Sequence, residues 1–274
     1  MTFPAGAVII PAHNEVSVIG RTLTALKPVL AAGSVEVIVV CNGCKDDTAK
    51  IASNFAGVTV LDLLEASKAA ALNEGDRVAT LWPRLYLDAD VEISPKAVGK
   101  VFRALSDGKT LAARPSFRYD TDGASVLVRA YYAARSRLPA TKTALWGAGA
   151  YAMSETGHRR IGAFPRLTGD DLYVDRMFAA NEKTVLNTEP TIVRTPRTVA
   201  SLLAVLRRVY GGNEQQDPDS RSSARTLNEL RQSVKGPKSV LDALVYVTFA
   251  LWARRQWSSS ETARLRWERD ESSR

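Results

Sequence analysis

Cysteine and histidine are scarce in this chain of 274 residues, which has two of each. Two cysteines, Cys41 and Cys44, are too few for the disulfide framework of a small secreted domain. A Cys-x-x-Cys pair is also a candidate redox motif or half of a zinc site. No second cysteine pair accompanies it, however, and neither His13 nor His158 has a ligand-like spacing to it. We therefore expect neither role.

Signals for secretion and for a membrane span are missing as well. The first residues lack the basic region and the apolar region of a signal peptide. The apolar run Leu241–Ala253, interrupted by Asp242 and Thr248, is shorter than the roughly 20 residues that a spanning helix needs. No internal repeat or low-complexity block is visible. We expect a cytoplasmic protein.

What the chain does have is the composition of an ordinary globular protein, with 45% hydrophobic and 24% charged residues. Its net charge of +8 favours anionic partners, which include phosphorylated substrates, nucleic acid and an anionic membrane surface. Nucleic acid is the least favoured of these, because no aromatic stacking motif or recognition helix accompanies the charge.

From Ala7 to Arg114, short apolar runs alternate with helix-like segments. Strands that read as continuous apolar runs between helices are typical of a parallel sheet covered on both faces. We therefore predict an α/β fold with a doubly wound, mostly parallel sheet. The expected strands are 8–10, 35–40, 58–61, 85–87 and 111–113, and the expected helices are 16–30, 47–55, 68–79 and 95–105. Ser94 and Pro95 form a typical helix start.

Polar residues follow each expected strand, where ligands bind in such sheets. Helix caps and turns explain each of these groups singly, but they do not require acidic residues and a lysine at one edge. Together the groups indicate a site for a phosphorylated ligand and a metal. The residues concerned are Pro11, His13, Asn14 and Glu15 after the first strand, Cys41, Asn42 and Asp46 after the second, Lys68 after the third, and Asp88 and Asp90 after the fourth.

The Asp88-Ala89-Asp90 stretch is the strongest of these signals. In an extended chain Asp88 and Asp90 point the same way, so that both reach one cation; the alternative is a polar turn after a strand. Carboxylate ligands suit Mg²⁺ or Mn²⁺. Either cation neutralises the charge that develops on a departing diphosphate. Lys68 would add a cation near the nucleotide, or else it is a solvated lysine at a helix start.

In these motifs and their order the chain resembles the family 2 glycosyltransferases, which have the GT-A fold. The resemblance covers roughly residues 7 to 180. It implies transfer of a sugar from a nucleotide-sugar donor to an acceptor hydroxyl, with inversion at the anomeric carbon and a divalent metal, Mg²⁺ or Mn²⁺. The matching segments are Val8–Glu15, Asn42–Thr48, Lys68–Asn73, Leu87–Asp90, and Gly169–Asp171 followed by Arg176.

The resemblance also assigns roles. It makes Asp90 a direct metal ligand, Asp88 a contact to ribose or metal, Asp171 the base that takes the acceptor proton, and Asp170 the acidic neighbour of that base. From the residues alone, the alternative is that Asp170 and Asp171 are favourable charges at a helix N-terminus. Trp146–Gly149 looks like the small-residue segment that lets substrate approach the backbone. Trp146 itself is more typical of a core residue than of a sugar-stacking one.

The chain departs from the family at two places. Many members have Asp directly after the second strand to hold the nucleobase, whereas this chain has Cys41, whose thiol is a poor acceptor; Asn42 or Asp46 is a possible substitute. The family's Gln-x-x-Arg-Trp motif is also absent. Arg207 and Arg208 lie in that region. They either contact the diphosphate or belong to a solvated helix face.

We expect a catalytic domain over 1–190, a helical extension over 191–257 with a linker at 211–223 that could act as a lid, and a charged tail over 258–274. Residues 240–255 predict a helix that docks on the domain, self-associates or contacts a membrane. From Arg194 to Lys238 there are nine Lys or Arg against four Asp or Glu. Peripheral contact with the inner face of the membrane, or a lipid-linked acceptor in place of a small molecule, is therefore a hypothesis.

Two alternative functions remain open from the sequence. A sugar-phosphate nucleotidyltransferase would use a similar sheet and similar metal ligands, but it usually has a Gly-rich phosphate loop after the first strand, where this chain has Pro11–Glu15. A non-catalytic nucleotide-sugar-binding subunit would tolerate loss of Asp90 or Asp171, and both are present.

Overall fold

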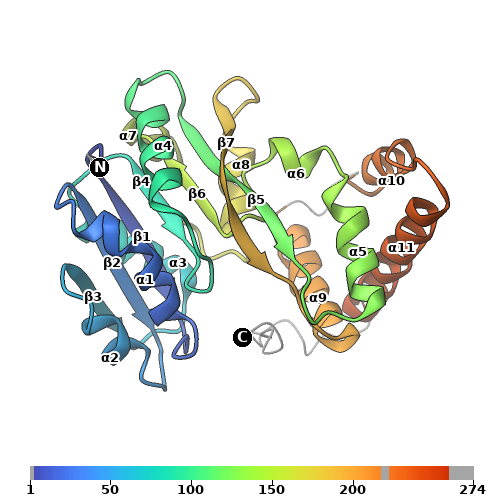
Figure 1. The fold of residues 1–274 in the computed structure, drawn as a ribbon, viewed down its shortest axis with the longest axis horizontal. Helices are drawn as coiled ribbons and strands as arrows, with labels where there is room; N and C mark the ends of the chain where they lie inside the picture. The colour runs from blue at the N-terminus through green and yellow to red at the C-terminus, as the bar shows by residue number, and fades with distance from the viewer. Residues whose placement is uncertain (1–2, 217–221, 259–274) are drawn as a thin grey trace. The chain divides into compact units, whose positions relative to one another are not determined.

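The structure is a computed structural model that describes residues 3–216 and 222–258. The described residues form a seven-stranded sheet with the order β3-β2-β1-β4-β6-β5-β7 (Figure 1). Its strands are β1 (Gly6–Ala12), β2 (Val35–Asn42), β3 (Val58–Leu63), β4 (Arg84–Leu87), β5 (Ala112–Asp120), β6 (Ala150–Met153) and β7 (Lys183–Arg194).

Helices follow most of the strands along the chain. The first four are α1 (Ile19–Leu30), α2 (Thr48–Ser53), α3 (Lys68–Val78) and α4 (Pro95–Ser106), close to the predicted ranges. Ser94 caps α4 as expected, because its hydroxyl accepts a hydrogen bond from the Ala97 N–H at 3.2 Å. The remaining helices are α5 (Val126–Ser136), α6 (Ala140–Thr143), α7 (Glu155–Ile161), α8 (Asp170–Arg176), α9 (Val199–Gln216), α10 (Ser222–Gln232) and α11 (Pro237–Ser258).

The first half of the sheet is parallel, and its strands β1, β2 and β4 are buried, whereas the edge strand β3 is partly exposed. β1 pairs in parallel with β2 and with β4, and β2 pairs in parallel with β3. Alternate residues of β1 enter two separate cores: Val8 and Ile10 pack in one with α1 and α4, and Ile9 packs in the other with α3. The predicted α/β fold is confirmed.

The second half of the sheet differs from a simple parallel extension. β6 lies between β4 and β5 and is antiparallel to both. It has only four residues, Ala150–Met153, and the sequence reading did not detect it. As a result, the segment that directly precedes β6 runs past the end of β4, where Asp88 stands.

By packing, the chain divides into two units. The first contains the residues up to Arg118, Ala144–Arg166 and Asp170–Val193. The second contains Tyr119–Thr143, Leu167–Gly169 and the described residues from Arg194 onward. Residues 119–143 and 167–169 thus pack with the C-terminal helices; the division into a catalytic domain over 1–190 and a helical extension over 191–257 stays a prediction.

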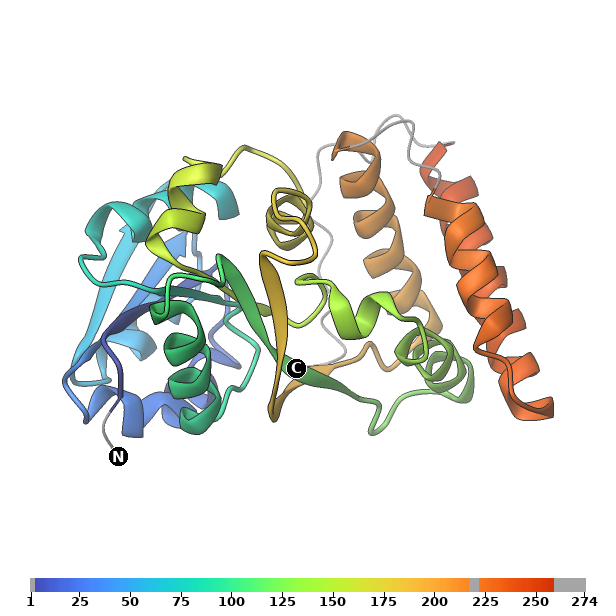
Figure 2. The ribbon, with the colours of Figure 1, turned by 90° about the horizontal axis from the view of Figure 1, so that it is seen from above.

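The second unit is helical, with α5, α9 and α11 in mutual contact. Figure 2 shows α9 and α11 side by side. Tyr131 of α5 stacks on Tyr246 of α11 with ring centroids 4.9 Å apart. Gly211 and Gly212, which we expected to open a linker, lie inside α9. Residues 213–216 of the predicted linker also belong to α9 and residues 222–223 to α10, while 217–221, like the tail from 259 onward, lie outside the described residues.

Candidate active site

The carboxyl end of β4 passes directly into a turn. The Val91 N–H donates to the Asp88 carbonyl at 3.1 Å, so residues 88–91 are not extended as we had predicted for the two aspartates. The Asp88 side chain is 41% exposed and Asp90 is exposed. The turn alternative is therefore correct for the backbone, while both carboxylates remain open to a ligand.

Lys68 joins two carboxylates from different parts of the chain. It is the first residue of α3, which is capped by the Ser67 hydroxyl, and its Nζ lies 2.7 Å from Asp88 Oδ1 and 2.8 Å from Asp170 Oδ1. The Lys68 side chain is 29% exposed. The alternative of a freely solvated lysine is excluded by these two ion pairs.

The charges of this group shift one another's protonation. Burial raises the pKa of Asp88 to about 6, and Asp170 and Asp90 add to this rise while Lys68 opposes it. Burial acts to lower the pKa of Lys68, but Asp170 and Asp88 outweigh burial and raise it. Lys68 is thus a permanent cation, and the carboxylates around it carry a surplus of negative charge.

Asp170 is held on both of its oxygens. In addition to the Lys68 ion pair, Oδ2 accepts a hydrogen bond from the Tyr151 hydroxyl at 2.7 Å, and the Asp170 side chain is only 12% exposed. Tyr151 belongs to β6 and stacks on Tyr86 of β4, with ring centroids 5.2 Å apart. Asp170 is therefore fixed in place as part of the lysine cluster.

Asp171 is held by the backbone. Its Oδ2 accepts the Gly147 N–H at 2.8 Å and its Oδ1 accepts the Leu172 N–H at 2.8 Å. Burial and the neighbouring Asp170 raise the pKa of Asp171, against the opposing effect of the Gly147 hydrogen bond. A raised pKa makes a carboxylate a better proton acceptor. Because one of the two donors comes from another segment, stabilisation of the α8 N-terminus alone does not account for Asp171.

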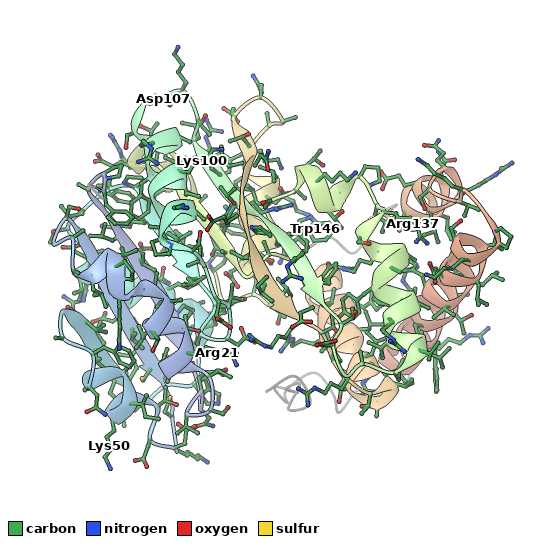
Figure 3. All side chains as sticks on the ribbon, in the orientation of Figure 1. Arg21, Lys50, Lys100, Asp107, Arg137 and Trp146 are labelled. Atoms are coloured by element: carbon green, nitrogen blue, oxygen red, sulfur yellow. The ribbon has the colours of Figure 1, made fainter. Side chains whose placement is uncertain are left out.

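Trp146–Gly149 connects the two halves of this site. Gly147 holds Asp171, and the Gly149 carbonyl accepts the Asp88 N–H at 2.8 Å. Gly149 has φ +60°, and a Cβ there would lie 2.4 Å from Val91 Cγ2. Its lack of a side chain thus serves contact with the 88–91 turn, in addition to any approach of substrate. Trp146, labelled in Figure 3, is half-buried.

The loops after β1 and β2 interlock beside this site. The Asn14 side-chain oxygen accepts the Lys45 N–H at 2.5 Å, the Asp46 carboxylate accepts the Val16 N–H at 3.2 Å, and the Glu15 N–H donates to Thr48 Oγ1 at 2.7 Å. Asn14 has φ +52°, a left-handed conformation that Asn tolerates better than most residues. Asn14 and Asp46 thus hold the two loops together in this structure.

Asn42 and His13 continue the same network. The Asn42 side-chain amide donates to the Ala12 carbonyl at 2.9 Å, and His13 Nδ1 contacts the Asn42 carbonyl. Asn42 is buried, while His13 and Glu15 are half-exposed. His13 is therefore a polar residue at a strand end, as we expected, and its contact with nucleotide stays a prediction.

Cys41 and Pro11 are strand residues rather than loop residues. Cys41 is fully buried and lies in the same core as Val37 and Val39. Burial, with a contribution from Cys44, raises the pKa of the Cys41 thiol to about 12. Pro11 is likewise buried, in β1. The correction concerns the strand end, because β2 runs two residues further than predicted and buries the Cys41 side chain; contact of Cys41 or Pro11 with the nucleotide sugar stays a prediction.

The residues fit a metal that is shared with a phosphorylated ligand. Among the described residues, no group of three or more His, Cys, Asp or Glu side chains could hold a metal by itself. Mg²⁺ and Mn²⁺ sites at phosphates typically use one or two protein carboxylates, which Asp88 and the exposed Asp90 supply. A cation there would offset the repulsion that raises the pKa of Asp88.

Sequence reasoning did not find Tyr151. Its contribution depends on a four-residue strand that pairs with β4 and on a hydrogen bond to Asp170, nineteen residues away, and neither leaves a pattern in the sequence. Arg207 and Arg208 lie on α9, in the second unit, and are half-buried; contact with diphosphate stays a prediction.

Comparison with known proteins gives a family and a fold. The model of glycosyl transferase family 2 matches residues 7–152, more than half of the chain. An uncharacterized protein of Methanocaldococcus jannaschii is 34% identical over 109 residues, which make up 38% of this chain and 44% of that protein. The chain therefore spans less than half the length of this curated relative.

Three solved structures share the fold at low identity. The mannosyltransferase PcManGT of Pyrobaculum calidifontis, in complex with GDP-mannose and Mn²⁺, has a TM-score of 0.61 at 19% identity, covering 96% of this chain and 77% of its own. Residues 1–349 of S. aureus TarS, in complex with UDP-GlcNAc, have a TM-score of 0.54 at 16% identity, covering 93% of this chain and 92% of that chain. M. tuberculosis glucosyl-3-phosphoglycerate synthase has a TM-score of 0.56 at 21% identity, covering 80% of this chain and 82% of that chain. The fold is therefore GT-A.

Proposed function

The chain belongs to glycosyl transferase family 2, and from this premise we propose that it moves a sugar from a nucleotide-sugar donor to an acceptor hydroxyl, with inversion at the anomeric carbon. The observation that supports this most is the bridge made by Trp146–Gly149. One short segment holds Asp88 through Gly149 and Asp171 through Gly147, at 2.8 Å in both cases. A donor end and an acceptor end of one site are thereby fixed to each other.

At the acceptor end, Asp171 is the base. It takes the proton from the acceptor hydroxyl as the oxygen of that hydroxyl forms a bond to the anomeric carbon, and the bond from that carbon to the diphosphate breaks on the opposite face. The raised pKa of Asp171 favours this proton transfer. The Gly147 and Leu172 N–H groups keep the carboxylate oriented. Asp170, held by Lys68 and Tyr151, is a positioning residue.

At the donor end, Asp88 and Asp90 are the residues that would hold a divalent cation, Mg²⁺ or Mn²⁺. When bound, the cation neutralises the charge that grows on the departing diphosphate. Lys68 places a permanent positive charge at the same position. The residues after β1 and β2, namely His13, Asn14, Glu15, Asn42 and Asp46, border the nucleotide.

The donor and the acceptor are not assigned by these residues. PcManGT was solved with GDP-mannose and TarS with UDP-GlcNAc, so similar folds accept different bases and sugars. We keep the predictions of a cytoplasmic location and of a lipid-linked or small-molecule acceptor. Cell fractionation tests the location. Among the alternative functions, no feature of the described site favours a nucleotidyltransferase or a non-catalytic subunit over the transferase.

The proposal is tested by incubating the protein with Mn²⁺ or Mg²⁺ and a panel of GDP- and UDP-sugars, and measuring nucleoside diphosphate release. We expect slow release from one donor class that stops when a chelator is added and is lost in Asp90→Asn. Turnover that is undiminished in Asp90→Asn would remove the metal assignment. Failure of the whole panel to support release, with added metal, would count against the transferase itself.

A further inference from the structure

One face of α11 is apolar and exposed. Val240, Leu241, Leu244, Leu251 and Trp252 are 44%, 61%, 60%, 54% and 45% exposed. Neighbouring members of this set are one, three or seven residues apart, which places all five along one side of a helix. We call this surface, defined by these five residues, the α11 outer face. Large apolar side chains gathered on one exposed helix face indicate an interaction site.

The opposite face of α11 is fixed against the rest of the second unit. Tyr246, Phe249, Ala250 and Ala253 are buried in a core that they share with α5 and α9, and Figure 2 shows both helices on one side of α11. Asp242, with a side chain 4% exposed, pairs at 3.0 Å with Arg137, the C-cap residue of α5. Figure 3 labels Arg137. Because α11 is anchored in this way, it cannot turn its outer face inward.

Basic residues stand at both ends of the α11 outer face. Lys235 is exposed just before the helix. The Lys238 side chain, in the first turn, is 86% exposed, and its Nζ lies 3.6 Å from Asp242 Oδ2. After Trp252, Arg255 is exposed, whereas Arg254 is half-buried and lies over the Tyr210 ring of α9, with its Cζ 4.8 Å from the ring centroid. The one carboxylate on α11 is Asp242, which is buried and paired. The outer face therefore presents apolar side chains between cations, with no exposed negative charge.

We propose that the α11 outer face binds an anionic lipid surface, with the helix lying in the plane of the interface. From Leu241 to Trp252 the helix rises about 17 Å, and no helix in the described part of the chain is long and apolar enough to cross a membrane. The exposed apolar side chains, with Trp at one end and basic residues at both ends, suit the boundary between lipid headgroups and acyl chains, while the opposite face of α11 stays packed in the protein core. Anionic headgroups complement the cations.

A second copy of the chain is a poorer occupant of the same face. The face is basic at both of its ends, so two copies would bring like charges together in either a parallel or an antiparallel pairing. Like charges placed together across an interface disfavour the complex. Charge complementarity thus favours the lipid surface.

The test is flotation of the full-length protein with vesicles of phosphatidylcholine, with and without phosphatidylglycerol. We expect binding to the anionic vesicles and little to the neutral ones. The triple variant Leu241→Gln, Leu244→Gln, Leu251→Gln should stay unbound. Leu64→Gln, the same change at a side chain that is 102% exposed in the loop after β3, should bind like the wild type.

The basic residues give an independent arm. Lys235→Gln with Lys238→Gln should weaken binding about fivefold for each charge, and added salt should weaken the wild type in the same direction. Wild-type protein that does not float with anionic vesicles would overturn the proposal, as would a triple variant that floats normally. A wild-type dimer that does not float and that becomes monomeric in the triple variant would assign the face to a second copy instead.

A measurement on the wild type guards against a variant that fails to fold. Acyl-chain-brominated phosphatidylcholine, mixed into the anionic vesicles, should quench the emission of Trp252, and the quenching should fall in Trp252→Phe. Quenching that is unchanged in Trp252→Phe would contradict contact through this face. None of these measurements needs a sugar donor, so their outcome is independent of the proposed transfer reaction.

Discussion

Replacing Lys68 by methionine removes the cation that holds Asp88 and Asp170, while keeping most of the apolar stem. Asp170 is the costlier loss, because its side chain is 12% exposed. Removing one partner of a buried ion pair typically costs about 3–5 kcal/mol. Asp88, at 41% exposed, is screened by water and adds about 1 kcal/mol at most. The hydrogen bond from Tyr151 to Asp170 remains and reduces the total. We expect a loss of about 2–4 kcal/mol in the free energy of unfolding.

The loss should depend on pH. Lys68 lowers the pKa of Asp88, so its removal raises that pKa further above about 6 in the folded state. A carboxyl group whose folded pKa lies above its unfolded value binds a proton preferentially in the folded state, so folding is relatively favoured as pH falls through the folded pKa. The difference between wild type and Lys68→Met should therefore be larger at about pH 8 than at about pH 5.

Urea unfolding with a chelator present measures this difference. Lys50→Met is the matched control, since Lys50 is exposed on α2 (Figure 3) and such surface changes usually stay within about 0.5 kcal/mol. If Lys68→Met and Lys50→Met are equally stable at about pH 8, the lysine is solvated in solution and the charge cluster described above is wrong.

Three further changes probe the same site. Gly149→Ala should lower stability by about 2–4 kcal/mol, because φ is +60° and the new Cβ would meet Val91 at 2.4 Å; a normal melting temperature would refute this packing. Tyr151→Phe should cost about 2 kcal/mol by leaving Asp170 without its hydroxyl donor, and an unchanged urea midpoint would exclude that bond. Gln216→Glu should lower kcat about 10- to 100-fold with little change in KM, because a carboxylate cannot donate to the Thr168 and Gly169 carbonyls, which the Gln216 amide contacts at 2.8 Å just before the acidic pair. If Gln216→Glu and Gln216→Ala lose the same amount of stability and neither loses kcat, the contact is only structural.

The parallel half of the fold could be predicted because its pattern is local. Apolar runs such as Val35–Val40 and the Ser94-Pro95 helix start each carry their own signal. β6 could not be predicted in the same way, because Ala150–Met153 is too short to show a period and becomes a strand only by pairing with β4 and β5. The antiparallel half of the sheet is thus set by contacts that are distant in sequence.

Cys41 and the Gly211-Gly212 pair show the same limit. Cys41 lies on the same face of β2 as Val37 and Val39 and is buried with them. This placement follows from the two-residue period of a strand once β2 is known to reach Asn42. Gly211 and Gly212 read as a break, yet α9 continues through them. A Cβ on Gly212 would lie 2.9 Å from the Thr168 carbonyl, so the lack of a side chain there permits close packing. The sequence shows the glycine but not the neighbour that requires it.

The motifs themselves were more informative than their predicted geometry. Asp88 and Lys68 were identified from residue type and position, and Asp170 from the family resemblance; the structure places Lys68 Nζ within 2.8 Å of a carboxylate oxygen of each aspartate. The 88–91 turn and the Gly147 and Gly149 contacts required the structure. Residue identity thus located the site, and the packing of β6 against β4 determined its shape.

The most direct test of the two-part site is Asp171→Asn, compared with Asp107→Asn as the matched change at an exposed carboxylate on the α4 C-cap. With the donor found in the panel and saturating metal, we expect Asp171→Asn to bind donor as tightly as the wild type, while transfer falls about 10²- to 10⁴-fold. Asp107→Asn should bind and transfer normally. Transfer by Asp171→Asn at the wild-type rate would contradict the account, because the site would then have another base.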